Sequence, residues 1–195
     1  MGMNFSKDFL FWTKVILYLC CFLLITGING CVQNKIFDFF DTLNHYRAIE
    51  KRYNQIMDIV PRQYRAEVEQ ISEKYQVPVL FFVRVVYHES RWNPRAKSKV
   101  NANGSYDAGL CQLNSYNFPY FRRIFSNFDP WNPRLNLEVG AWFLRQMYNQ
   151  HGNWFAALAA YNAGSYSVRS GRLPNSTKRY LAAVKKSLQP INKGV

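Results

Sequence analysis

Glu89 is the residue of this sequence best placed for acid–base chemistry. On a helix it would share a face with Phe82, Val85 and Val86, so its carboxyl would emerge from an apolar stripe. Apolar surroundings raise the pKa of a carboxyl. A general acid that cleaves a glycosidic bond needs a raised pKa, because it must still hold a proton near neutral pH. The alternative is that Glu89 ends a helix and points into water, as an isolated glutamate usually does.

Asp107 is a candidate second carboxylate in the same sequence. Enzymes that hydrolyse glycosidic bonds generally use two carboxyl groups, one as acid and the other as base or nucleophile. An aspartate within a run rich in Gly and Ser can equally serve to fix a turn. The residues alone leave both interpretations of Asp107 open.

Other catalytic chemistries lack their residues at the required spacing. A zinc-protease helix would need a second histidine at position 92, where Trp92 stands. The histidines His45, His88 and His151 show no ligand pattern. The sequence has neither a Gly-x-x-x-x-Gly-Lys loop nor a Gly-x-Ser-x-Gly elbow. We therefore expect no metal site and no cofactor.

Three short motifs follow one another along the chain. Residues 88–94 read His-Glu-Ser-Arg-Trp-Asn-Pro, and residues 104–114 read Gly-Ser-Tyr-Asp-Ala-Gly-Leu-Cys-Gln-Leu-Asn. Residues 157–164 read Ala-Leu-Ala-Ala-Tyr-Asn-Ala-Gly, and Tyr180 comes later. This order resembles the Glu-Ser, Gly-Leu-Met-Gln and Ala-Tyr-Asn motifs of the soluble lytic transglycosylases, with Cys111 in place of the usual Met.

The resemblance covers about residues 62 to 185 and implies a fold and an activity. The implied fold is an all-α, lysozyme-like domain with a cleft for alternating N-acetylmuramic acid and N-acetylglucosamine. Glu89 would protonate the glycosidic oxygen. As a carboxylate it would then accept the proton of the muramic C6 hydroxyl, which closes onto C1 to give a 1,6-anhydro end.

The same resemblance implies roles for five further residues. Gln112 and Asn162 would hydrogen-bond the substrate or the Glu89 carboxyl. Two tyrosines would flank that carboxyl, and a serine would hold the adjoining loop. The implied substrate-binding residues are Ser90, Gln112, Tyr161, Asn162 and Tyr180.

Three other functions compete with the transglycosylase. A hydrolysing muramidase would use Asp107 as its second carboxylate. The resemblance favours the turn-fixing role, because a family branch associated with secretion and conjugation machines carries Asp in this Gly-Ser-Tyr-Asp context. A non-catalytic wall-binding module would need no acid, which the presence of Glu89 argues against. Single-strand nucleic-acid binding would suit the aromatic content, but an export signal opposes it.

The elements expected to position these residues are helices. Apolar residues recur at helical spacing over residues 36–43, 64–75 and 137–148, and Pro78 can open a helix that runs from Val79 to Glu89. Strict strand-type alternation is scarce. Loop-rich stretches, over residues 92–107 and 114–134, are expected to frame a cleft.

The first thirty residues have the layout of an export signal. Lys7 and Lys14 precede an apolar run over residues 15–25, which smaller and more polar residues follow. The segment that ends at Gly30-Cys31 resembles a bacterial lipoprotein box, with Cys31 as the lipidated residue, although an uncleaved membrane anchor is an alternative. We expect a signal or anchor over 1–30, a helical spacer over 31–61, a catalytic domain over 62–188 and a tail over 189–195.

Charge and cysteine content agree with an exported domain in the bacterial cell envelope. The 195 residues hold 25 Lys and Arg against 12 Asp and Glu, a net charge of +13, which favours an acidic polymer as partner. Peptidoglycan fits, because its peptide stems and muramic lactyl groups carry carboxylates. Cys111 is the lone cysteine of the presumed folded part, so no internal disulfide is expected.

Overall fold

The structure, a computed structural model, describes residues 30–188, with side chains from Phe39 onward. The expected signal or anchor segment and the tail over 189–195 lie outside the described residues, as does the side chain of Cys31. The chain divides into two units, with the boundary between Lys51 and Arg52. Each unit is described by itself below.

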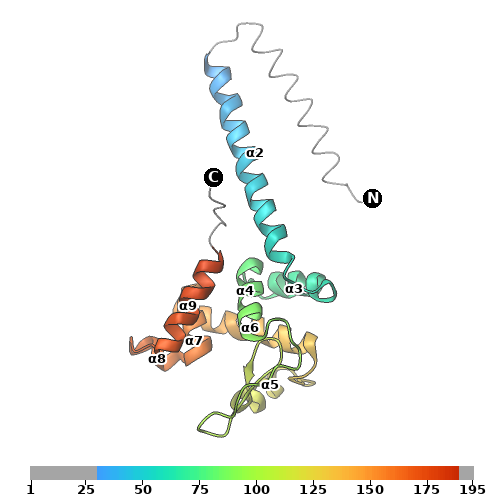
Figure 1. Cartoon of the computed structure of the whole chain (residues 1–195), viewed down its shortest axis with the longest axis vertical. Helices are drawn as coiled ribbons and strands as arrows, with labels where there is room; N and C mark the ends of the chain where they lie inside the picture. The colour runs from blue at the N-terminus through green and yellow to red at the C-terminus, as the bar shows by residue number, and fades with distance from the viewer. Residues whose placement is uncertain (1–29, 189–195) are drawn as a thin grey trace. The chain divides into compact units, whose positions relative to one another are not determined.

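Helix α2 (Gly30–Met57) is the described part of the first unit and supplies the opening residues of the second (Figure 1). It contains the helix predicted over residues 36–43. Phe39, Tyr46 and Ile49 are exposed on it. Among the helices of residues 30–188, none is long and apolar enough to cross a membrane.

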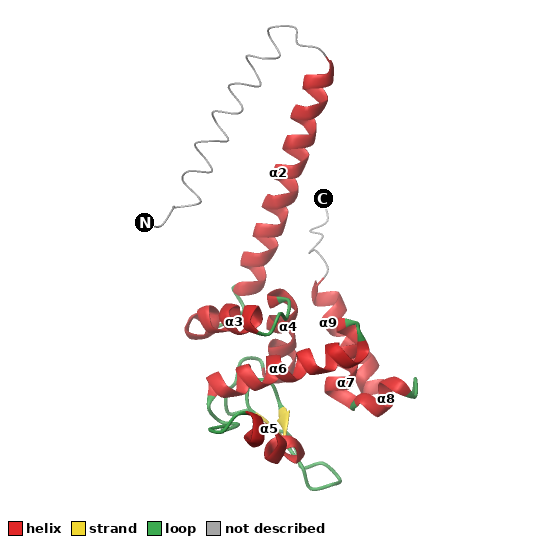
Figure 2. Ribbon diagram, turned by 180° about the vertical axis from the view of Figure 1, so that it is seen from behind, coloured by secondary structure: helices red, strands yellow, loops and turns green. Residues whose placement is uncertain are grey.

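The second unit is built from helices, as the sequence predicts (Figure 2). Pro61 and Pro78 stand immediately before α3 and α4, where a missing backbone N–H does no harm. Asn132 and Asn153 cap α6 and α7 with their side chains, and Gly152 ends α6 in a left-handed conformation. The helices are α3 (Arg62–Lys74), α4 (Val79–Ser90), α5 (Phe118–Ile124), α6 (Pro133–His151), α7 (Trp154–Ala163), α8 (Ser165–Arg169) and α9 (Asn175–Leu188).

The core of this unit lies among α3, α4, α6, α7 and α9. Helix α4 packs on α3 and α9, α6 packs on α3 and α7, and α7 packs on α9. Phe82, Val86, Leu137, Leu144 and Leu158 are almost completely buried there. Burial of such side chains is the main stabilising contribution expected for a domain without a disulfide.

The region between α4 and α6 is more regular than the sequence predicts. Strands β1 (Asp107–Ala108) and β2 (Leu113–Asn114) pair antiparallel, with Asp107 opposite Asn114 and Ala108 opposite Leu113. A 3-10 turn (Ser115–Asn117) and α5 follow, within the stretch over 114–134 that is predicted to be loop-rich. The sequence pattern does not predict α5, because this helix spans only two turns and is held by tertiary packing of its aromatic residues.

Candidate active site

Glu89 lies in the last turn of α4, as the helical pattern predicts. Phe82, Val85 and Val86 are buried on the same helix, while the Glu89 side chain is only partly buried. Burial raises the pKa of the Glu89 carboxyl to about 7; the hydrogen bond from Tyr180 acts in the opposite direction, and the Asp107 charge adds to the rise. The group is therefore able to hold or release a proton near neutral pH.

The backbone turns sharply immediately after Glu89. Arg91 and Trp92 both have positive φ, 54° and 63°, in the left-handed region that non-glycine residues seldom occupy. The Trp92 ring is buried and stacks on Tyr64 of α3, with ring centroids 6.1 Å apart. This packing holds the strained turn, so the end of α4 and the Glu89 carboxyl have a fixed position.

Tyr180 of α9 contacts Glu89 directly. Its hydroxyl donates a hydrogen bond to Glu89 Oε1 at 2.6 Å. Burial raises the pKa of Tyr180 well above its usual value, so the phenol keeps its proton and remains a donor. The Tyr180 ring also packs edge-on against His88, with centroids 6.1 Å apart. Packing of α9 on α4 thus delivers a hydrogen-bond donor to the Glu89 carboxyl.

A cleft of about 320 Å³ collects most of the predicted site residues. Its size is within the range of ligand-binding clefts. Glu89, Asp107, Gln112, Tyr161 and Asn162 all line it. The other lining residues come from β2, the 3-10 turn, α5, α6 and the end of α7, and they are Leu113, Asn114, Asn117, Phe121, Phe143, Ala160 and Gly164.

Gln112 has a backbone φ of 47° and uses its amide to hold its own loop. Its Nε2 donates hydrogen bonds to the carbonyls of Ala96 at 3.0 Å and Gly109 at 2.9 Å. Both amide protons are therefore committed to the backbone. The predicted contact with substrate is left to Oε1, which can only accept a hydrogen bond.

Tyr161 and Asn162 at the end of α7 have different partners. The Tyr161 hydroxyl donates to the carbonyl oxygen of Cys111 at 2.7 Å, so its proton is used to hold the Cys111 backbone. Asn162 Oδ1 accepts a hydrogen bond from the Thr177 hydroxyl at 2.8 Å. Asn162 lines the cleft, and because the Thr177 hydroxyl bonds Oδ1, Nδ2 is the donor that the amide still has available.

Asp107 combines a place in the cleft with a structural contact. Its Oδ1 accepts a hydrogen bond from the Asn114 amide at 2.8 Å, across the hairpin from which both residues come. The Asn114 side chain also accepts the Tyr116 N–H and so begins the 3-10 turn. The turn-fixing interpretation of Asp107 thus has a specific partner, while its carboxylate faces the same cleft as Glu89.

Ser90 is buried and does not line the cleft. Its hydroxyl donates to the Val86 carbonyl one turn earlier in α4, at 3.3 Å. The Ser90 hydroxyl is thus used within its own helix, while the Ser90 carbonyl accepts the Asn93 N–H of the adjoining loop at 3.0 Å.

Asn136 supports the site, although no role was predicted for it. It is completely buried on α6, where its Oδ1 accepts the Cys111 N–H at 2.7 Å. Its Nδ2 donates to the carbonyls of Ala108 at 3.0 Å and Pro130 at 2.9 Å. One amide therefore ties Ala108 and Cys111, which precede Gln112 on the connection from β1 to β2, to Pro130. A polar residue within the apolar repeat of α6 was the available signal.

Gly140 allows this segment to approach α6 closely. A Cβ at position 140 would lie 2.4 Å from Cys111 Sγ and 2.6 Å from Cys111 Cβ, distances that real side chains do not reach. The Cys111 thiol is completely buried in this contact. The cysteine found in place of the usual Met is therefore a packing residue against a bare helix backbone.

A partly buried carboxyl with a raised pKa, in a cleft of a helical domain, can serve as a general acid and base. A family model described as the transglycosylase SLT domain matches residues 67–181, more than half of the chain. The chain belongs to this family. The resemblance found in the sequence motifs is confirmed.

Two curated relatives match over different shares of their length. The soluble lytic murein transglycosylase of Escherichia coli K12 is 27% identical over 134 residues, which are 66% of this chain and 20% of that protein. Protein IpgF of Shigella flexneri is 28% identical over 113 residues, 56% of this chain and 74% of that protein. The chain thus spans about a fifth of the length of the first relative.

Solved structures confirm the fold class. The 70 kDa soluble lytic transglycosylase from Escherichia coli superposes with a TM-score of 0.56 and 26% identity, over 70% of this chain and 25% of that one. The complex of the 70 kDa enzyme with bulgecin A gives a TM-score of 0.55 and 26% identity, over 65% of this chain and 24% of that one. The all-α, lysozyme-like fold is therefore the observed one.

Proposed function

We propose that the chain is a peptidoglycan lytic transglycosylase, which cleaves the bond between N-acetylmuramic acid and N-acetylglucosamine and leaves 1,6-anhydro ends. The observation that carries the proposal is the Glu89 carboxyl, which lines the cleft, has a pKa raised to about 7 and accepts a hydrogen bond from Tyr180. Such a group can act in turn as proton donor and proton acceptor at one pH.

The proposed reaction has two steps, both at Glu89. The protonated carboxyl donates its proton to the glycosidic oxygen, the bond to the muramic C1 breaks, and the N-acetylglucosamine side leaves as an alcohol. The resulting carboxylate accepts the proton of the muramic C6 hydroxyl while that oxygen bonds to C1. The proton balance closes at Glu89, and no catalytic water is needed. A held intramolecular hydroxyl can compete with water at an effective molarity of ~10⁵ M or more.

Tyr180 has a distinct role in this scheme. Because its hydroxyl donates to Oε1, the proton that is transferred is assigned to Oε2. When Glu89 becomes a carboxylate, the same hydrogen bond becomes charge-assisted and therefore stronger. Tyr180 thus stabilises the form of Glu89 that takes the second proton.

The surrounding side chains are assigned to binding the glycan. Asn162 Nδ2 is proposed as a donor to a substrate carbonyl or hydroxyl, and Gln112 Oε1 as an acceptor from a hydroxyl. Tyr161 is proposed to act through the Cys111 backbone that it holds. Asp107 is proposed to fix the hairpin and to help keep Glu89 protonated through its charge.

We further propose the location and organisation predicted from the sequence. The catalytic domain would span residues 62–188 on the outer side of the membrane, with peptidoglycan as its substrate and a helical spacer before it. A lipid on Cys31 or an uncleaved anchor would attach it. The net charge of +13 supports this assignment, because basic rims speed the encounter with an acidic polymer.

Zymography on peptidoglycan tests the proposed function. The purified chain is expected to clear peptidoglycan embedded in a gel, and Glu89→Gln is expected to leave it intact. Asn153→Gln, which alters an exposed cap of α7 outside the cleft, serves as a matched amide control that should keep clearing activity. Clearing by Glu89→Gln would overturn the assignment, and a silent wild type that still binds sacculi would favour a wall-binding module.

A further inference from the structure

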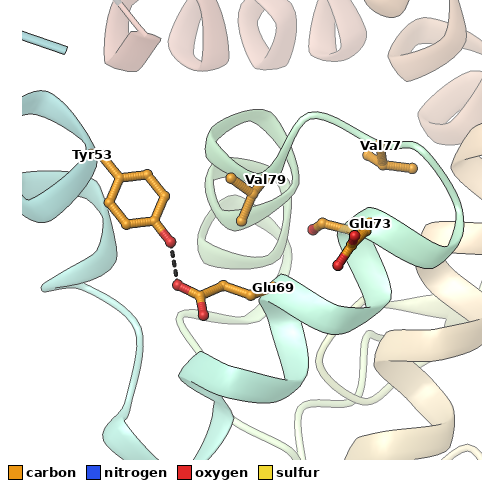
Figure 3. A pocket seen from close by; sticks show the side chains of 6 residues that line it. Tyr53, Glu69, Glu73, Val77 and Val79 are labelled. Carbon is orange, nitrogen blue, oxygen red and sulfur yellow. Dashed lines mark hydrogen bonds between the residues drawn. The ribbon is translucent and has the colours of Figure 1, made fainter. Parts of the chain in front are cut away.

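A second opening lies in the second unit, away from the cleft. This groove, of about 480 Å³, is lined by the end of α2, by α3, by the following turn and by the start of α4 (Figure 3). It shares no lining residue with the cleft. Val79 begins α4 and Glu89 nearly ends it, so the two sites are separated by about 15 Å along that helix. The lining residues are Tyr53, Glu69, Ser72, Glu73, Val77 and Val79.

The groove carries negative charge in a strongly basic protein. Glu69 and Glu73 are one turn apart on α3, and both carboxylates are exposed. Neither takes part in the ion pairs found among the described side chains, and Lys74, which follows, is paired with Glu138 instead. Like charges at this spacing repel each other. A cation between them would remove the repulsion.

Ser72 adds a polar atom without a partner. Ser72 is 4% exposed and lines the groove, and its buried Oγ makes no hydrogen bond to any described residue. A buried hydroxyl normally finds a partner, because an unmade hydrogen bond is unfavourable. The orphaned oxygen therefore indicates a donor supplied from outside the chain.

Tyr53 and the two valines complete the shape of the site. The Tyr53 hydroxyl donates to Glu69 Oε1, and burial together with that carboxylate raises the pKa of Tyr53 to about 12. This hydrogen bond fixes the position of the Glu69 carboxyl beside the groove (Figure 3). Val77 is buried and Val79 partly buried, so they offer an apolar wall beside the carboxylates.

We infer that this groove binds the lysine or arginine side chain of a basic segment in a partner protein. The ammonium or guanidinium group would lie between Glu69 and Glu73 and donate to Ser72 Oγ, with its methylene stem along Val77 and Val79. The helix dipole places about half a positive charge at the amino end of α4, which repels a cation. The two full negative charges of the carboxylates outweigh this repulsion. The inference does not depend on the proposed activity.

A metal ion is the alternative ligand for this groove. Among the described side chains no group of three His, Cys, Asp or Glu residues could hold a metal, and this groove offers only two carboxylates. Calcium usually takes six to eight oxygen ligands. An apolar wall also serves a hydrocarbon stem and not a hydrated ion. The lining therefore favours an organic cation.

A pair of matched peptides tests the inference. The full chain in neutral detergent is titrated into a blocked seven-residue peptide with one central lysine between two valines, carrying an uncharged fluorophore. The matched peptide has norleucine in place of lysine. Because the chain carries +13, non-specific attraction would disfavour the lysine peptide. We expect the lysine peptide to bind roughly tenfold more tightly than the norleucine peptide. This ratio corresponds to ~1.4 kcal/mol, which is typical of a hydrogen bond to a charged group.

Variants locate the binding. Glu69→Gln combined with Glu73→Gln should abolish the preference for lysine and leave peptidoglycan cleavage unchanged. Asp58→Asn combined with Glu67→Gln removes the same charge outside the groove and should keep the preference. Glu73→Gln alone, which breaks no hydrogen bond, and Ser72→Ala should each weaken it. The inference would be overturned if the two peptides bound equally, or if the control pair of substitutions removed the lysine preference as fully as the groove pair does. Full displacement of the peptide by low-millimolar calcium at constant ionic strength would also overturn it.

Discussion

The acidity of Glu89 results from opposing contacts of a single side chain. Burial disfavours the carboxylate and the Asp107 charge adds to this effect, whereas the Tyr180 hydrogen bond favours the carboxylate. Burial is the largest of the three, so the pKa moves from 4.5 to about 7. A carboxyl with that pKa is poised for both proton transfers at neutral pH.

The stability of Glu89→Gln relative to the wild type should increase as the pH rises. The folded state binds the Glu89 proton more tightly than the unfolded state, so wild-type stability falls as the pH rises from about 4.5 to about 7. Glutamine cannot ionise, and the stability difference should grow by on the order of 3 kcal/mol across this range. Urea denaturation of both proteins at several pH values measures it. A constant difference would mean that Glu89 is not desolvated.

Tyr180→Phe should shift the pH dependence of cleavage. Without the hydroxyl the pKa of Glu89 rises further, so the alkaline limb of the pH–rate profile should move to higher pH. The rate at the optimum should fall roughly tenfold, because a hydrogen bond to a charged group contributes about 1.5 kcal/mol or more. Tyr161→Phe, whose hydroxyl bonds the Cys111 backbone instead, should lower the rate without moving the limb. If Tyr161→Phe moved the alkaline limb and Tyr180→Phe did not, Tyr161 would be the residue that acts on the Glu89 carboxyl.

At the residue scale the sequence predicts the environment of the Glu89 carboxyl well and the hydrogen-bond partners of the neighbouring residues less well. The apolar face of α4 follows directly from helical periodicity, and it is what raises the pKa. The partners of Gln112 and Ser90 do not follow from any periodicity. Gln112, in the left-handed conformation, bonds the backbone carbonyls of Ala96 and Gly109, and Ser90, the last residue of α4, bonds the Val86 carbonyl one turn earlier.

At the element scale, the segment from β1 to β2 depends on one buried amide of α6. Asn136→Ala would leave the Cys111 N–H and the carbonyls of Ala108 and Pro130 without partners. We expect a loss of stability on the order of 3 kcal/mol or more, since each unmade buried bond costs about 1–3 kcal/mol. Chemical denaturation measures the loss.

Asn132→Ala is the matched control for that substitution. Asn132 lies one turn earlier and only caps α6, so its loss should cost about 1 kcal/mol. An Asn136→Ala variant as stable as Asn132→Ala would show that the segment is held by other contacts.

The long helices were predictable and the short elements were not. Helices α3, α4 and α6 carry apolar residues at helical spacing, and prolines or Asn caps mark their beginnings. Strands β1 and β2 have two residues each, too few for an alternating pattern. Their pairing depends on contacts with α6, which are distant in sequence.

At the scale of the whole molecule, attachment to the membrane is predicted from the sequence alone. The junction Gly30-Cys31 after an apolar run supports lipidation at Cys31. Cys31→Ala should therefore move the protein from the detergent phase to the aqueous phase in a partitioning assay, whereas Cys111→Ala should not. Unchanged partitioning of Cys31→Ala would favour an uncleaved anchor.

The acidic groove shows what whole-molecule reasoning from the sequence misses. Glu69 and Glu73 are unremarkable charges on an exposed helix face in the sequence. Their setting arises only when the end of α2 and the start of α4 pack beside α3 and leave Ser72 without a partner. The net charge of +13 hides this local reversal of sign.

The products released from purified sacculi test the central claim most directly. If Glu89 works alone and the C6 hydroxyl closes onto C1, wild type should release muropeptides with 1,6-anhydro ends, lighter by one water than hydrolysed ends in mass spectrometry. Asp107→Asn should keep measurable activity with the same ends, because Asp107 fixes the hairpin through Asn114. Predominantly reducing muramic ends from the wild type, together with complete loss of cutting in Asp107→Asn, would contradict the transglycosylase account and make the protein a hydrolase with two catalytic carboxylates.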